Sequence, residues 1–130
     1  EQAESIMRAV GKIVWVTDET LMDTVTAVSG SGPAYFFYLM EALEQAAIEE
    51  GLDEKTARLL TLETALGAAQ LAIETAKSPL ELRDQVTSPG GTTEAAIQVL
   101  NYSGTSQKFK SAVTAARKRS TDMAIFWGKE

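Results

Sequence analysis

The stretch PAYFFYLMEALEQAAI, at residues 33–48, constrains the fold more than any other part of this sequence. Proline suits a first helical position and Gly51 suits a helix end, so one helix is predicted over about 33–50. Its N-terminal turns are apolar around most of the circumference, which is typical of a helix buried on all sides. A chain of 130 residues has few elements to surround such a helix. We therefore expect an intertwined dimer; the alternative is the central helix of a monomeric bundle.

Helical patterns also cover most of the remaining chain. Ser78 and Glu81 form a capping-box pattern around Pro79, which is a strong signal for a helix start. Apolar spacing and the placement of glycine and capping residues indicate the other helices. The predicted helices span residues 3–10, 33–50, 53–77, 79–86, 94–101 and 106–126, and a short segment at 21–28 reads as helix or strand. The predicted fold class is therefore all-α, a helical bundle.

One segment does not fit an all-helical chain. IVWV at residues 13–16 is β-branched and aromatic, and it reads as a strand. A lone strand leaves its backbone groups unpaired, so it pairs either with a second copy or with a sheet outside this chain. The helix-then-strand order favours the second reading, in which residues 1–18 close an α/β domain and residues 19–130 form the helical domain. The chain begins at Glu1, not methionine, and we expect it to be a piece of a longer protein.

The composition excludes several classes of chemistry. The sequence has no cysteine and no histidine, which removes thiolate nucleophiles, zinc–sulfur sites, histidine triads and imidazole metal sites. A net charge of −6 argues against binding to nucleic acid or to an anionic membrane. The longest apolar run, AYFFYLM, is too short to span a bilayer. We predict no metal, no nucleic-acid partner, no membrane partner and a cytoplasmic location.

Glycines gather in two stretches, SGSGPAY at 29–35 and TSPGGTTEA at 87–95. Each is predicted to run into a helix N-terminus, where free backbone N–H groups and the helix dipole favour an anion. The second stretch adds hydroxyls, and neither contains lysine or arginine. Such neutral donors suit a single carboxylate better than a triphosphate. The alternative is that both stretches are simple turns between helices with capping hydroxyls.

Other candidate motifs fail on their spacing. Gly30-Ser31-Gly32 begins like a dinucleotide fingerprint, but Tyr35 stands where the third glycine is required. Ser31 lies in no nucleophile-elbow pattern and has no histidine to activate it. Asp84 could act as a general base, although a polar residue before a turn more often orients the turn. The residues alone therefore predict a helical, dimeric fragment with one or two small-anion cradles.

The two glycine stretches resemble the C-terminal domain of pyrroline-5-carboxylate reductases, which catalyse the last step of proline synthesis. SGSGPAY and, downstream, ELRDQVTSPGGTTEAAIQVL carry the resemblance. The matching positions are Val86, Thr87, Ser88, Pro89, Gly90, Gly91, Thr92, Thr93, Ala96, Ile97 and Leu100. The resemblance runs from AVGKIVWVTDE to the last helix and is weakest over residues 101–110.

This resemblance implies a two-domain enzyme of which the chain is the second domain. An upstream dinucleotide-binding domain would bind NADPH or NADH, and residues 1–18 would be its last helix and strand. Residues 19–130 would form the dimerisation and substrate-binding domain, giving a homodimer or an assembly of dimers. The fragment alone would then be inactive. A related reductase for another carboxylate or imine, and a non-catalytic dimerisation module, are the alternatives.

The resemblance also implies roles for individual residues. Hydride would pass from the nicotinamide to the imine carbon of pyrroline-5-carboxylate and give L-proline. Thr93 would be the catalytic residue, hydrogen-bonded to the ring nitrogen. The substrate would be bound by Ser88, Gly90, Gly91, Thr92 and Thr93, and Ser31, Gly32 and Pro33 would lie near the nicotinamide.

Overall fold

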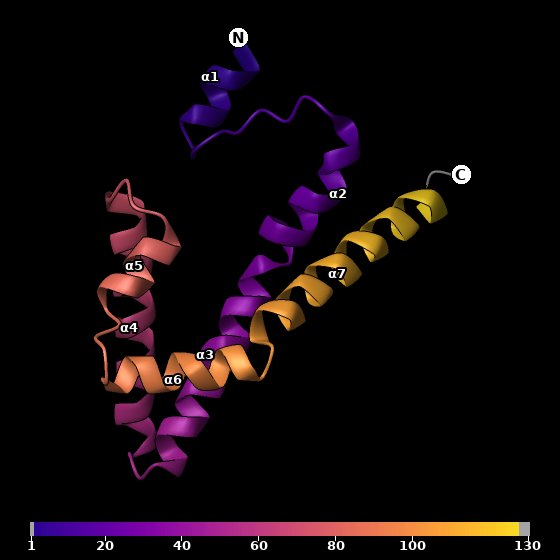
Figure 1. Cartoon of the computed structure of the whole chain (residues 1–130). Coiled ribbons are helices and arrows are strands. Elements are labelled where there is room, and N and C mark those ends of the chain that lie inside the picture. Colours follow the sequence, from indigo (N-terminus) through magenta and orange to yellow (C-terminus); the bar gives the residue numbers. More distant parts are fainter. Residues whose placement is uncertain (1, 128–130) are drawn as a thin grey trace.

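The computed structural model describes residues 2–127, and every regular element within them is helical (Figure 1). This confirms the all-α class. The elements are α1 (Gln2–Arg8), η1 (Glu19–Leu21), α2 (Met22–Val25), η2 (Thr26–Gly30), α3 (Gly32–Glu49), α4 (Glu54–Glu74), α5 (Pro79–Gln85), α6 (Thr92–Tyr102) and α7 (Thr105–Trp127). None of these helices is both long enough and apolar enough to cross a membrane.

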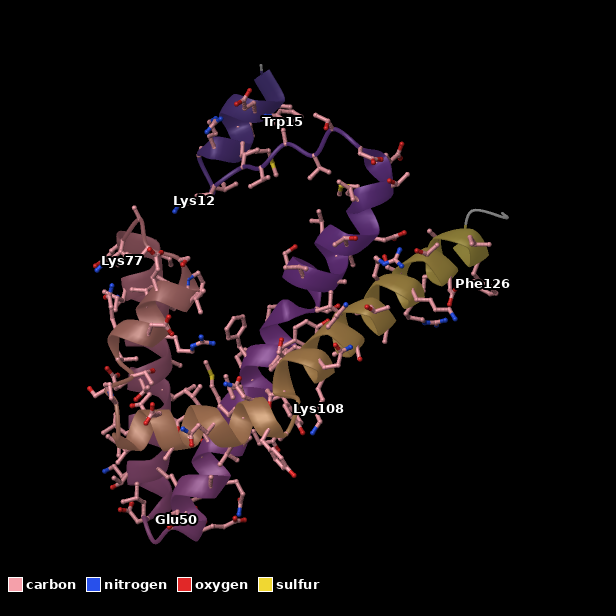
Figure 2. The ribbon with its side chains drawn as sticks, viewed as in Figure 1. Lys12, Trp15, Glu50, Lys77, Lys108 and Phe126 are labelled. Carbon is pink, nitrogen blue, oxygen red and sulfur yellow. The ribbon has the colours of Figure 1, made fainter. Side chains whose placement is uncertain are left out.

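The strand predicted at residues 13–16 is not formed in the described chain. Residues 12–16 belong to no helix or strand and connect α1 to η1. Val14 is 84% exposed and Trp15 is 68% exposed, and Figure 2 shows Trp15 on the thin connection that leaves α1. An extended segment becomes a strand only when another strand satisfies its backbone N–H and C=O groups. The β-branched pattern was present, but residues 2–127 of a single copy supply no strand partner.

The segment from Met22 to Glu49 follows one helical path through α2, η2 and α3. This resolves the ambiguity at residues 21–28 in favour of helix. The turn η2 is a π-helix, in which the Ser31 N–H donates to the Thr26 carbonyl oxygen at 2.9 Å. The Tyr35 hydroxyl donates to the carbonyl oxygen of the buried Ala27 at 3.0 Å. The predicted glycine-rich loop at residues 29–32 is therefore wrong, because these residues continue the helix through a wide turn.

Helices α3 and α4 form a hairpin (Figure 1). The local sequence explains where α3 ends and where α4 begins. Gly51 has a φ of 103°, a left-handed conformation that suits glycine after a helix. The Asp53 carboxylate accepts a hydrogen bond from the Thr56 N–H at 3.0 Å and caps α4. The only buried residues of α4 are Ala57 and Thr61. Small side chains there let the two helices approach closely.

A carboxylate on α2 connects the beginning of the helical region to α7. The Asp23 Oδ1 atom accepts from the Ser120 hydroxyl at 2.7 Å, and Oδ2 accepts from the Thr121 hydroxyl at 2.6 Å. These hydrogen bonds, Thr121 first and Ser120 second, hold the pKa of Asp23 below its ordinary value of 3.8. Asp23 therefore fastens the C-terminal half of α7 against α2.

We expect Asp23→Ala to lower the melting temperature at neutral pH. Because the pKa of Asp23 is depressed in the folded state, its stabilising contribution is present above 3.8 and is lost as the pH falls through the depressed pKa. The difference in melting temperature between variant and wild type should therefore shrink below pH 3.8. Thermal denaturation followed by circular dichroism over a pH series measures this. Asp122→Ala, an exposed carboxylate on the same helix, is the control, and an equal loss there would contradict the assignment.

Candidate functional site

The candidate site is the connection between α5 and α6, and it begins where α5 is closed off. The Val86 N–H donates to the Arg83 carbonyl oxygen and the Thr87 N–H donates to that of Asp84, both at 3.2 Å. The Thr87 hydroxyl also donates to the Arg83 carbonyl oxygen, at 2.6 Å. The Thr87 hydroxyl therefore stabilises the C-terminal end of α5.

Residues 88–91 then form a tight turn that explains the Pro-Gly-Gly sequence. The Gly91 N–H donates to the Ser88 carbonyl oxygen at 3.0 Å, with Pro89 and Gly90 at the centre of the turn. Gly90 has a φ of 72°, which a type II turn requires at its third residue and which glycine adopts without strain. A Cβ atom on Gly91 would lie 3.0 Å from the Ser88 carbonyl oxygen. The geometry of the turn thus gives a separate reason for the residue type at each of these three positions.

Helix α6 starts immediately after this turn with unpaired backbone donors. It begins at Thr92, two residues before the predicted start at residue 94, so Thr92 and Thr93 occupy its first turn. The first amide of the helix that is paired with the backbone is that of Ala95, whose N–H donates to the Gly91 carbonyl oxygen at 3.2 Å. Within the described residues, the N–H groups of Thr92, Thr93 and Glu94 have no acceptor. Together with the helix dipole, these amides favour an anion.

Three hydroxyls at the turn are also free to bind a ligand. Those of Ser88, Thr92 and Thr93 make no hydrogen bond within the described part of the chain, in contrast to that of Thr87. Ser88 and Thr92 are exposed, whereas Thr93 is half-buried. The sequence analysis assigned Ser88, Thr92 and Thr93, and not Thr87, to the substrate. In the structure the Thr87 hydroxyl closes α5, and the other three hydroxyls remain available.

The two glycine amides are not free, contrary to the expectation that the turn would expose them. The Gly91 N–H closes the turn on Ser88, and the Gly90 N–H donates to Glu94 Oε2 at 2.8 Å. Sequence reasoning assigned no role to Glu94. The signal that could have found it is an acidic residue in the first turn of a helix, four positions after a glycine.

The first glycine stretch does not form the predicted anion cradle. Ser31 is half-buried and its N–H is already paired, Gly32 is buried and begins α3, and Pro33 is exposed. In Figure 1 the start of α3 lies toward α2 and α7, whereas the start of α6 lies toward α4 and α5. A single chain therefore does not bring the two stretches together.

Two pockets of the helical region are lined by residues other than those of the turn. One of about 590 Å³ lies between α3, α6 and the start of α7, where Tyr38 and Phe109 form part of its wall. Another of about 520 Å³ lies between α4 and α5, with Leu71 and Val86 on its wall. Neither is lined by residues 88–93. The turn therefore lies open on the surface of a single chain.

Comparison with known proteins places this geometry in a family. The family model described as pyrroline-5-carboxylate reductase dimerisation matches residues 19–123. The pyrroline-5-carboxylate reductase of Pseudomonas aeruginosa is 52% identical over 95% of this chain and 45% of its own length. Pyrroline-5-carboxylate reductase 1 of Bacillus subtilis is 43% identical over 94% of this chain and 41% of its own length.

Solved structures give the same result. A pyrroline-5-carboxylate reductase from Coxiella burnetii superposes with a TM-score of 0.88 at 53% identity, covering 93% of this chain and 45% of that one. The Plasmodium falciparum pyrroline carboxylate reductase, solved with NADP bound, superposes with a TM-score of 0.84 at 30% identity, covering 94% and 48%. The chain thus spans less than half the length of these relatives. On this likeness in sequence and fold, the chain belongs to the pyrroline-5-carboxylate reductase dimerisation family.

Proposed function

We propose that this chain is the dimerisation and substrate-binding part of a reductase that converts pyrroline-5-carboxylate to L-proline with NADPH or NADH. Membership of the family supports the reaction, and the turn at residues 88–91 supports the place of the substrate. The observation that carries the proposal is the group of unpaired amides and hydroxyls at the start of α6. An enzyme of proline synthesis is expected in the cytoplasm, and this location is part of the proposal.

The dinucleotide would be bound mainly by a region that precedes this chain in its relatives. Residues 1–18 would be the last helix and strand of that domain, and residues 19–130 the helical domain. In that setting the segment at 13–16 would gain the strand partner that it lacks here. A relative solved with NADP bound supports a nicotinamide cofactor, which supplies the hydride when it is present. Ser31, Gly32 and Pro33 would lie near the nicotinamide and shape the pocket.

The residues of the turn would bind and polarise the substrate. Ser88 and Thr92 would hold the carboxylate by neutral hydrogen-bond donors. Gly90 would add its N–H where the carboxylate displaces Glu94, and Gly91 would contribute by closing the turn on Ser88. The Thr93 hydroxyl oxygen would accept a hydrogen bond from the protonated ring nitrogen, which keeps the imine carbon electrophilic. This is catalysis by positioning around a reactive cofactor, and no covalent intermediate on the protein is required.

The test uses the whole protein, with the region that precedes Glu1 in its relatives restored. We expect NAD(P)H oxidation that depends on pyrroline-5-carboxylate, and none from the isolated chain. Oxidation of NAD(P)H by the isolated chain would contradict the proposal that the dinucleotide is bound mainly by the preceding region. A whole protein that reduces only another carboxylate or imine would support the related-reductase alternative, and one that reduces nothing would support a non-catalytic dimerisation module.

We further propose that the chain forms a homodimer through α3. Helix α3 is strongly apolar, yet three of its aromatic side chains are exposed in the single chain. Phe36 is 65%, Phe37 66% and Tyr38 73% exposed. Large aromatic side chains exposed on an apolar helix are typical of a protein interface, and the name of the family supports a second copy as the partner. A further assembly of these dimers belongs to the same proposal.

Sedimentation velocity tests the dimer. We expect the wild type to sediment as a dimer or an assembly of dimers and Phe37→Asp to sediment as a monomer, because the interface would have to bury an unpaired carboxylate. Ile6→Asp is the control, since Ile6 is 69% exposed on α1, which stands apart from the helical region (Figure 1). A monomeric wild type would overturn the proposal.

A further inference from the structure

The carboxylate of Glu94 occupies part of the same cradle that the substrate would use. Its Oε2 atom accepts a hydrogen bond from the Gly90 N–H at 2.8 Å. Glu94 is half-buried in the first turn of α6, directly after Thr92 and Thr93, whose amides and hydroxyls are unpaired within the described residues. One of the donors expected to hold a carboxylate ligand therefore already holds a carboxylate of the protein itself.

No basic residue adjoins this carboxylate along the chain. Residues 86–95 contain no lysine or arginine. The nearest basic residue along the chain is Arg83, whose Nη2 atom lies 3.3 Å from Asp84 Oδ1 in an ion pair. A substrate carboxylate entering the cradle would meet a like charge and would either displace Glu94 from Gly90 or bind beside it. Both routes weaken binding, the first through a lost charged hydrogen bond and the second through repulsion.

We propose that Glu94 is an internal competitor that sets the affinity of this site for the substrate carboxylate. The inference rests on the proposed function, because it assumes that the substrate binds at residues 88–93. The opposite possibility is that Glu94 only supports the turn and the start of α6, as acidic residues in a first helical turn do. The two roles predict opposite changes in substrate affinity, so one substitution separates them.

The experiment compares Glu94→Gln with the wild type in the whole enzyme. Glutamine keeps the shape and an acceptor oxygen but removes the charge. We expect KM for pyrroline-5-carboxylate to fall about fivefold, the effect of removing one like charge near the ligand. The KM for NAD(P)H and kcat should not change. The dissociation constant of L-proline, measured by calorimetry without turnover, should fall by a similar factor because proline carries the same carboxylate.

Glu74→Gln is the matched control, since Glu74 is exposed at the end of α4 and makes no hydrogen bond through its side chain within the described chain. A KM for the substrate that rises or stays unchanged in an active, folded Glu94→Gln enzyme would overturn the competitor role and leave the proposed function intact. A wild-type enzyme that does not reduce pyrroline-5-carboxylate would overturn both.

Discussion

Replacing Gly91 by valine in the whole protein should abolish most of the pyrroline-5-carboxylate-dependent oxidation of NAD(P)H. A Cβ atom at this position lies 3.0 Å from the Ser88 carbonyl oxygen, the same atom that accepts the hydrogen bond from the Gly91 N–H. That neighbour is backbone, so the turn itself would have to open. The hydroxyls of Ser88 and Thr92 would then move relative to the amides of α6, and a displacement of about 1 Å can cost roughly a hundredfold in rate.

Steady-state kinetics measures this effect, with a rise in KM for the substrate as the main sign. Gly67→Val in α4 is the matched control, because a Cβ atom there meets nothing within 4 Å and its φ lies outside the left-handed region. We expect the control enzyme to keep wild-type kinetics and the Gly91→Val enzyme to remain folded by circular dichroism. Wild-type KM and kcat in Gly91→Val would show that the substrate does not depend on this turn.

Thr93→Ala should lower kcat with little change in stability. The Thr93 hydroxyl makes no hydrogen bond within the described chain, so its removal leaves no partner unsatisfied in the protein. If it contacts the protonated ring nitrogen, the loss of one charged hydrogen bond reduces turnover roughly ten- to a hundredfold. Thr93→Ser, which restores a hydroxyl, should recover most of the rate.

Thr87→Ala provides the contrasting control, because Thr87 is next to Ser88 in sequence but its hydroxyl closes α5 and is not a proposed substrate ligand. Its hydroxyl donates to the Arg83 carbonyl oxygen, so its removal should lower the melting temperature more than it lowers kcat. The pair of threonines therefore separates a stabilising hydroxyl from a catalytic one. Near-normal kcat in Thr93→Ala would remove Thr93 from the reaction, whatever its effect on stability.

Local signals in the sequence predicted most helix ends correctly. The Ser78 capping box is present in both directions, Asp53 caps α4, and α3 ends just before Gly51. These features depend on residues within four positions of one another, and hydrogen bonds of that range do not require the rest of the fold. The same reasoning located the turn at 88–91, and its role in binding the substrate stays a prediction.

One prediction failed because it treated local composition as sufficient, and another depends on a partner that was expected outside this chain. The glycines at 29–32 read as a loop, yet η2 continues the helix, with Tyr35 donating to Ala27 and α7 packed against this turn. The β-branched residues at 13–16 read as a strand, yet the described chain has nothing for them to pair with. Both outcomes depend on what lies alongside a segment in space.

The amino-acid sequence alone determined the helical class, the helix caps and the position of the hydroxyl-rich turn, because apolar periodicity, proline and glycine act over a few residues. The tertiary structure was needed to show how α7 is held. Asp23 meets Ser120 and Thr121 across 97 and 98 positions of sequence, and α7 packs against η2. Pairing between groups depends on their distance in space, and folding alone sets that distance.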